Sequence, residues 1–205
     1  MNEDVDFQIN WTNSRGILPR FTYHAFDNTI PAKDQARKYW NIIKADRDGP
    51  CVGDLEKREG IHALIWKSWY EYLTELQMLS GLSSPWIWIY TNFYFWEEFT
   101  MSATDAQREW FEQFPLWLAS YPQDPFFPNY AAIRVPRPWT QCVLLQSGMP
   151  AIGIEAGVES KEIDYNQWNG DEQSFAKYFT GSIPPIEPEP EEPMNGVIDV
   201  PERNI

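Results

Sequence analysis

Two acidic residues separated by one position, Asp54 and Glu56 in the segment CVGDLEKREG, are the first candidates for chemistry in this sequence. On a β-strand, side chains two residues apart lie on the same face, with Cα atoms about 6.5 to 7 Å apart. Two carboxyl groups that face one cavity repel each other when ionised, which raises the pKa of one of them. Glycoside hydrolysis uses such a pair of acid and carboxylate. A solvated charged loop is the alternative, because Asp-x-Glu is a common tripeptide.

Two further segments place polar side chains at the end of an apolar run. Tyr23 and His24 close the run in FTYHAFD, and Asp164 precedes the Asn169-Gly170 turn in KEIDYNQWNG. A single histidine among aromatic residues is more often hydrogen-bonded in a core than catalytic. An aspartate beside a turn is explained equally well by hydrogen bonds to neighbouring amides. By themselves, these residues indicate structure rather than catalysis.

Strands and helices must position these side chains, and the chain alternates short β-rich runs with helical patterns. Helical spacing of apolar residues predicts one helix that begins at Pro31 and another over residues 61–79. Strands are expected at residues 17–26, 51–55, 86–91, 116–121 and 142–146. Such alternation implies parallel strands joined by crossovers, and therefore an α/β layered sheet or a (β/α) barrel. In both, active sites form at the carboxyl ends of the strands.

Composition limits the partners of this chain. Its 205 residues are enough for one domain with a sizeable core. The 30 acidic and 16 basic residues give a formal net charge of -14, which disfavours nucleic acids and anionic membrane surfaces. The two cysteines, Cys51 and Cys142, are too few for a disulfide framework and belong to no metal-ligand motif, so both are predicted to be buried. The aromatic run at residues 90–99 has helical spacing, which favours core over a sugar-binding platform.

The two ends of the chain differ from its body. The start, MNEDVDFQINW, lacks the basic and apolar regions of a signal peptide, and no stretch of 18 apolar residues occurs. Residues 182–194 alternate Pro and Glu, which predicts an extended linker. We therefore expect a β/α domain over residues 1–181, a linker over 182–194 and a tail over 195–205, with no membrane insertion.

A series of segments, in this order, carries a resemblance to a known family. FQINWTNSRGILPRFTYHAF is similar to a helix followed by a strand that ends in Tyr-His-Phe, and PCVGDLE to a strand that ends in Asp-x-Glu. Further matching segments are DQARKYW, WIWIYTNFYFW, LWLASY, PRPWTQCVLLQSG and GIEAGVESKEIDYNQWNG. Together they resemble glycoside hydrolase family 25, the lysozymes that cleave peptidoglycan between N-acetylmuramic acid and N-acetylglucosamine. The resemblance implies a (β/α) barrel of that type.

The resemblance also implies roles for single residues. Glu56 would be the general acid and base, and Asp54 would orient the N-acetyl group of the substrate. Four further side chains would contact the sugar: Tyr23, Tyr90, Gln146 and Asp164. The acetamido oxygen of the substrate would attack its own anomeric carbon, so the resemblance implies no protein nucleophile, no metal and no cofactor. The aromatic residues that flank the family's glutamine are replaced here by Leu145 and Ser147.

The resemblance departs from the family pattern at its start. Family members open with a Gly-x-Asp-x-Ser strand, a helix and a second acidic strand, whereas the matched segments begin at the next helix. We therefore expect a barrel that is incomplete or permuted at its N-terminus. The tail MNGVIDVPERNI resembles the family's first strand, with Asp199 at the position of its aspartate. Since open sheet edges pair readily with other strands, this tail and a second chain are both candidates to complete the barrel. The alternative is a tail that begins a second module or stays unpaired.

These observations predict a peptidoglycan hydrolase of phage or bacterial type, whose partner is the glycan strand of the cell wall. Without a signal peptide, it would be made in the cytoplasm and act on the wall after release or as part of a virion. The alternative is a non-catalytic carbohydrate-binding or structural protein that retains a degenerate lysozyme fold. A further alternative is a split gene product that needs a separate chain.

Overall fold

The computed structural model describes residues 9, 11–16, 20–45, 47–60, 62–122, 128–148, 154 and 163–179. A six-stranded sheet in the order β1-β2-β3-β4-β5-β6 is its central element. Its strands are β1 (Thr22–Ala25), β2 (Cys51–Asp54), β3 (Ile87–Asn92), β4 (Leu116–Ala119), β5 (Leu144–Gly148) and β6 (Tyr165–Trp168). The first five are parallel, which confirms the α/β prediction, whereas β6 runs antiparallel to β5. Antiparallel neighbours need no crossover helix, and no helix of the described residues lies between these two strands.

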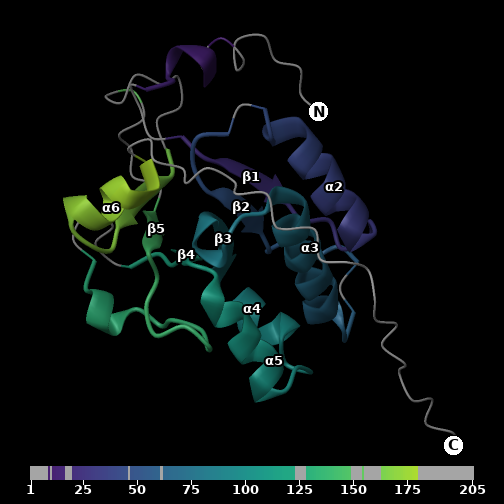
Figure 1. Cartoon of the computed structure of the whole chain (residues 1–205). Coiled ribbons are helices and arrows are strands. Elements are labelled where there is room, and N and C mark those ends of the chain that lie inside the picture. The colour runs from purple at the N-terminus through teal and green to yellow at the C-terminus, as the bar shows by residue number, and fades with distance from the viewer. Residues whose placement is uncertain are drawn as a thin grey trace, which may run out of the picture.

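Helices cover the sheet on both sides. They are α2 (Ala32–Ile43), α3 (Ile65–Ser80), α4 (Phe93–Phe99), α5 (Asp105–Glu109) and α6 (Glu172–Phe179). Short 3-10 turns occupy Ser84–Trp86, Trp110–Gln113 and Tyr130–Ala132. In Figure 1, α2 and α3 lie on one side of the sheet and α6 lies on the other. The sheet is therefore the middle layer of the described fold.

The helix boundaries follow from local sequence. In α2, the residues that face the core recur at helical spacing: Ala32, Gln35, Ala36, Tyr39 and Ile43. Helix α3 ends at Gly81, whose φ of 63° is left-handed and whose N–H donates to the carbonyl of Gln77 over 2.9 Å. Glycine is the residue that adopts this conformation most readily. The sequence prediction placed both helices correctly, with starts at Ala32 and Ile65 instead of Pro31 and residue 61, the latter lying outside the described residues.

The two faces of the sheet carry separate cores. The larger core lies between the sheet and helices α2, α3 and α4, and it includes the strand residues Cys51, Ile89 and Leu118 and, just after β2, Leu55. The smaller core lies on the opposite face. It consists of Val52, Trp88, Trp117 and Leu144, with Phe21, Tyr90, Trp168, Tyr178 and Phe179 packed around them. Helix α6 therefore covers the second face by placing its aromatic side chains on those of the strands.

The predicted strands lie where the sequence placed them, with shorter or shifted ends. The run at 17–26 forms a strand only over Thr22–Ala25, and residues 17–19 lie outside the described residues. The last predicted strand shifts by two residues, to Leu144–Gly148. Both cysteines are buried free thiols, as predicted. The linker 182–194, the tail 195–205 and the domain boundary between them also fall outside the described residues, so these remain predictions.

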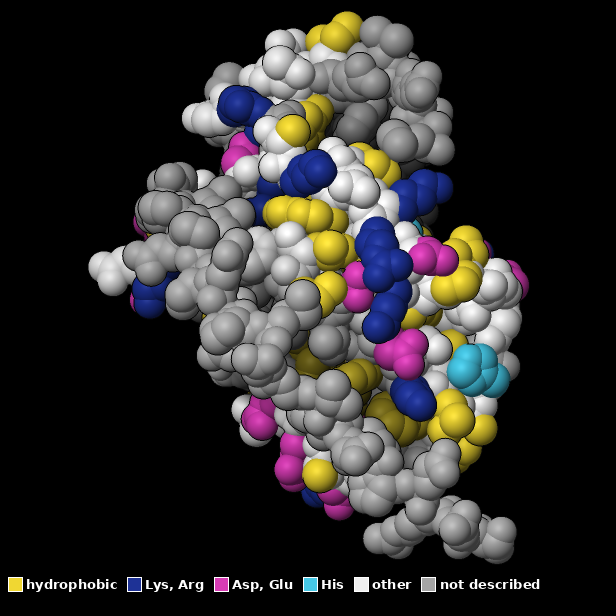
Figure 2. Space-filling view, turned by 45° about the vertical axis from the view of Figure 1, so that its right-hand side comes forward, with side chains coloured by type: hydrophobic (Ala, Val, Ile, Leu, Met, Phe, Trp, Pro, Cys, Tyr) yellow, Lys and Arg dark blue, Asp and Glu magenta, His cyan; other side chains and the backbone are white. Residues whose placement is uncertain are grey.

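The surface over α2 and α3 mixes charges of both signs. Figure 2 views the molecule from the side on which these helices lie, and it shows basic and acidic side chains next to one another there. One contributor is Arg37, which pairs with Glu75 over 2.9 Å and with Asp34 over 3.5 Å. Among the helices of the described residues, none has the length and apolar character needed to cross a bilayer.

Candidate active site

The end of β2 determines where the acidic pair points. Leu55 follows the strand, and its N–H donates to the carbonyl of Tyr90 over 2.9 Å. The hydroxyl of Thr91 donates to the carbonyl of Leu55 over 3.1 Å. The side chain of Leu55 is buried in the larger core, against the helices. Because side chains alternate along extended backbone, Asp54 and Glu56 project together to the opposite face.

These two carboxyl groups line one hollow at the carboxyl ends of the parallel strands. Its volume is about 210 Å³. The residues that line it come from all six strands of the sheet and the segments next to them: Tyr23, Val52, Asp54, Glu56, Tyr90, Trp117, Gln146, Asp164 and Asn166. Six side chains singled out from the sequence are therefore brought together in one place: Tyr23, Asp54, Glu56, Tyr90, Gln146 and Asp164.

Hydrogen bonds connect the polar side chains that β3, β4, β5 and β6 contribute to this hollow. The buried side chain of Gln146 accepts hydrogen bonds through Oε1 from the hydroxyls of Tyr90, at 2.6 Å, and Tyr121, at 3.1 Å. Across the β5–β6 pair, Asn166 lies opposite Gln146 and accepts from the indole N–H of Trp117 over 2.9 Å. Burial raises the pKa of the Tyr90 hydroxyl, so it remains a hydrogen-bond donor at neutral pH.

The carboxyl groups hold their protons more tightly than exposed ones. Burial raises the pKa of Asp54 to about 7, with the neighbouring Glu56 carboxylate as the second cause. Burial also raises the pKa of Glu56, and the charge of Asp164 adds to this shift. Since the groups interact, the proton retained near neutral pH belongs to the pair rather than to either residue. The hollow therefore contains an acid and a carboxylate side by side.

His24 takes the structural role that its sequence context favours. Its Nε2 lies 3.1 Å from Oε1 of Gln35, and its ring stacks on those of Tyr39 and Tyr72. These partners belong to the helical side of the sheet, whereas the next residue toward the N-terminus, Tyr23, lines the hollow. Tyr23 is 64% exposed, which leaves its ring accessible to a ligand.

Besides the apolar Val52, three contributors to the site are absent from the sequence prediction: Trp117, Tyr121 and Asn166. Trp117 and Tyr121 belong to the segment LWLASY, and Asn166 lies two residues after Asp164. The spacing of Asp164 and Asn166 is the signal that would have found the latter, because residues i and i+2 of a strand share a face. Asp199 lies outside the described residues, so its place in the site remains a prediction.

Within the described ranges, no group of three or more histidine, cysteine, aspartate or glutamate side chains has the geometry of a metal site.

Comparison with solved structures places this fold among known enzymes. The chain is similar to the spore cortex lytic enzyme SleM of Clostridium perfringens, with a TM-score of 0.62 and 19% identity over 84% of this chain and 56% of that chain. It is also similar to GHIP, a glycosyl hydrolase 25 and virulence factor of Streptococcus pneumoniae that participates in host cell invasion. Here the TM-score is 0.61, with 18% identity over 85% of this chain and 71% of that chain. No protein-family model and no curated protein sequence matches the chain.

The chain therefore has the α/β fold of these two enzymes, one of which is a glycosyl hydrolase 25, as the series of segments predicts. It spans 56% of the length of SleM. In the described residues the sheet is open, with β1 at one edge and β6 at the other, which agrees with an incomplete barrel. The likeness establishes the arrangement of strands and helices, and the chemistry rests on the carboxyl groups described above.

The raised pKa of Asp54 predicts how its replacement changes stability with pH. An unfolded aspartate ionises near pH 4, whereas folded Asp54 keeps its proton to about pH 7. Between these values the folded chain binds more protons, so the contribution of Asp54 to stability falls as the pH rises. Asp54→Asn should therefore raise the free energy of unfolding at pH 8 by roughly 4 kcal/mol relative to its effect at pH 4.

Urea denaturation at pH 4, 6 and 8 measures this difference. Asp34→Asn is the matched control, because it removes the same charge from an exposed turn of α2. A stabilisation by Asp54→Asn that does not change with pH, or that matches the control at each pH, would contradict the buried-carboxyl explanation.

Proposed function

We propose that this protein is a peptidoglycan hydrolase that cleaves the β-1,4 bond between N-acetylmuramic acid and N-acetylglucosamine. One observation carries the proposal: Asp54 and Glu56 share a hollow in which burial raises the pKa of both. The fold of the two enzymes to which the chain is similar supports it. Its target is the glycan strand of the bacterial wall, reached after release from the cytoplasm or as part of a phage particle.

In the first half of the reaction, protonated Glu56 gives its proton to the glycosidic oxygen. The bond between that oxygen and the anomeric carbon breaks, and the leaving sugar departs with a hydroxyl at C4. The acetamido oxygen of the retained sugar forms a new bond to the anomeric carbon, which gives a cyclic oxazolinium ion. The Asp54 carboxylate accepts a hydrogen bond from the acetamido N–H and stabilises the positive charge, so no protein nucleophile takes part.

In the second half, the Glu56 carboxylate removes a proton from water, and the water oxygen attacks the anomeric carbon. The oxazolinium ring opens and the acetamido group is restored. Glu56 regains its proton, so one water is consumed per bond cleaved, and configuration at the anomeric carbon is retained. The raised pKa of Glu56 suits both halves, because burial makes the carboxyl hold its proton more readily for the first half and makes the carboxylate a stronger base in the second.

The remaining side chains of the hollow bind the sugar in this proposal. The exposed ring of Tyr23 stacks on a sugar face, while Tyr90 and Gln146 present a connected set of polar atoms to its hydroxyls. Asp164 raises the pKa of Glu56 and accepts a sugar hydroxyl. The proposal also includes the tail, whose Asp199 would contact the substrate if the tail, or a second chain, pairs with an open edge of the sheet.

Replacing the proposed acid tests the assignment directly. Glu56→Gln should reduce the loss of turbidity of a peptidoglycan suspension by a factor of about 100 or more, because proton transfer is lost. Glu98→Gln is the control, since Glu98 pairs with Arg58 on the surface, away from the hollow. Equal rates for the native chain and Glu56→Gln would remove Glu56 from catalysis. Absence of lysis by the native chain, with retained binding to glycan, would favour the non-catalytic alternative.

Participation of the acetamido group predicts a dependence on substrate acetylation. Peptidoglycan in which the acetyl groups of N-acetylmuramic acid have been removed should be cleaved about 100-fold more slowly, because the attacking oxygen is missing. Measured release of reducing ends from acetylated and deacetylated wall gives the comparison. Similar rates on both substrates would point to a protein nucleophile instead.

Thr91 is a positioning residue for the acidic pair. Thr91→Val removes its hydrogen bond to Leu55, and Thr100→Val removes an equivalent buried bond to the carbonyl of Trp96. Both changes should lower the free energy of unfolding by about 1 kcal/mol. Only Thr91→Val should also lower kcat, by roughly tenfold, because the strand end that holds Asp54 and Glu56 loosens. Equal kcat values for the two variants would show that the bond serves stability alone.

A further inference from the structure

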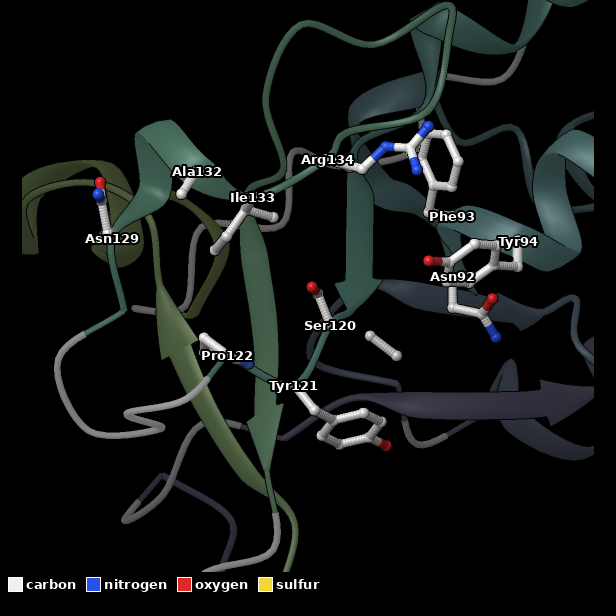
Figure 3. A pocket seen from close by; sticks show the side chains of 11 residues that line it. Asn92, Phe93, Tyr94, Ser120, Tyr121, Pro122, Asn129, Ala132, Ile133 and Arg134 are labelled. Carbon is white, nitrogen blue, oxygen red and sulfur yellow. The ribbon is translucent and has the colours of Figure 1, made fainter.

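A second and larger hollow lies beside the acidic one, with a volume of about 860 Å³. It forms at the carboxyl ends of β3 and β4 and along the segment that contains the 3-10 turn Tyr130–Ala132. Figure 3 shows the side chains that line it. They are Asn92, Phe93, Tyr94, Ala119, Ser120, Tyr121, Pro122, Asn129, Ala132, Ile133 and Arg134.

The two hollows adjoin at Tyr121. Its side chain lines the larger hollow, and its hydroxyl donates to Gln146, which lines the smaller one. Asn92, in the larger hollow, lies two residues after Tyr90, in the smaller. The smaller hollow is below the range of ~300 to 1,000 Å³ that small-molecule sites usually have. A ligand bound at the carboxyl groups therefore extends beyond them, and the larger hollow is the adjoining space.

The charges of the two hollows are opposite. The smaller one is lined by three carboxyl groups and the larger one by none, whereas Arg134 is the cation among the lining residues of the larger. The guanidinium of Arg134 lies over the ring of Phe93, 3.9 Å from its centre, as Figure 3 shows. In the part of the chain that the structure describes, no carboxylate lies within ion-pair distance of Arg134. An aromatic ring thus holds this cation in place, and among the described residues its N–H groups have no carboxylate partner.

We propose that the larger hollow binds the acidic peptide that muramic acid carries, with a carboxylate of that peptide on Arg134. This inference rests on the proposed function, whose substrate it specifies further. In the peptide-bearing glycan the lactyl carboxyl of muramic acid is an amide, so the carboxylates that can pair with Arg134 are those of the peptide. The peptide is attached to the sugar next to the cleaved bond. Asn92, Ser120 and Asn129 supply hydrogen-bonding groups for peptide amides, and the rings of Phe93 and Tyr121 supply apolar contact.

The net charge of the chain makes this pairing a selective one. At -14, the protein repels polyanions at long range, so Arg134 supplies a local attraction that a neutral ligand does not experience. Charge complementarity of this kind contributes more to specificity than to raw affinity. The enzyme is then selective for wall that still carries its peptides.

Binding of two soluble ligands to the full chain tests the inference. One is the N-acetylglucosamine–N-acetylmuramic acid disaccharide with its tetrapeptide, and the other is the same disaccharide with a simple amide on its lactyl group in place of the peptide. Neither contains the bond that the proposed reaction cleaves, so calorimetry reports affinity alone. The native chain should bind the peptide-bearing ligand about fivefold more tightly, as a partly exposed ion pair allows. Arg134→Gln should abolish this preference, Arg134→Lys should restore part of it, and salt should weaken it.

Arg58→Gln is the matched control, because Arg58 also lies over an aromatic ring, that of Phe95 at 4.5 Å, but outside both hollows. The inference is overturned if the preference survives in Arg134→Gln, if the control abolishes it equally, if the native chain shows no preference, or if neither ligand binds at millimolar concentration.

These outcomes are separate from those of the proposed hydrolysis. If the native chain lyses wall and Glu56→Gln does not, but Arg134→Gln keeps the peptide preference, only the role of the larger hollow is wrong. If the preference depends on Arg134 while the native chain lyses nothing, the chain binds peptidoglycan and the proposed catalysis is wrong.

Discussion

The burial of one apolar side chain, Leu55, is the constraint on which the acidic site depends. Leu55 packs toward the helices, and its backbone is held on both sides by β3, through the carbonyl of Tyr90 and the hydroxyl of Thr91. Because side chains alternate along extended backbone, Asp54 and Glu56 must then project to the face opposite Leu55. The larger hydrophobic core therefore orients two charged groups that it does not contact, and the free energy that stabilises the fold also sets the geometry of the hollow.

Burial of carboxyl groups acts against stability in this chain, and the structure shows how the cost is limited. Asp54 and Glu56 keep protons more readily than exposed acids, which avoids two adjacent buried charges. The hydroxyls of Tyr90 and Tyr121 both donate to Gln146, so these two donors do not form their hydrogen bonds with the carboxyl groups. The acids are therefore left to interact with a ligand. A site with this balance is less stable than an apolar one and is chemically more useful.

The sequence predicted the parts of this structure that local patterns encode. The tripeptide Asp-x-Glu at the end of an apolar run, and the order of segments around it, were sufficient to identify the fold and six residues of the hollow. Trp117 was not identifiable, because β4 is buried on both faces and shows no alternation from which its direction could be read. Only the register that pairs Trp117 with Tyr90 reveals it. The antiparallel direction of β6 and the cation at Arg134 likewise depend on contacts between segments far apart in the chain.

The aromatic packing of α6 has a consequence for how the protein reaches this structure. Tyr178 lies against the rings of Trp86, Trp88 and Trp168, and Phe179 lies against Trp88. These indoles belong to strands and turns made much earlier than α6 during synthesis, apart from Trp168. Until residues 172–179 leave the ribosome, no helix covers these indoles, so one face of the nascent sheet exposes apolar surface of the kind that aggregates.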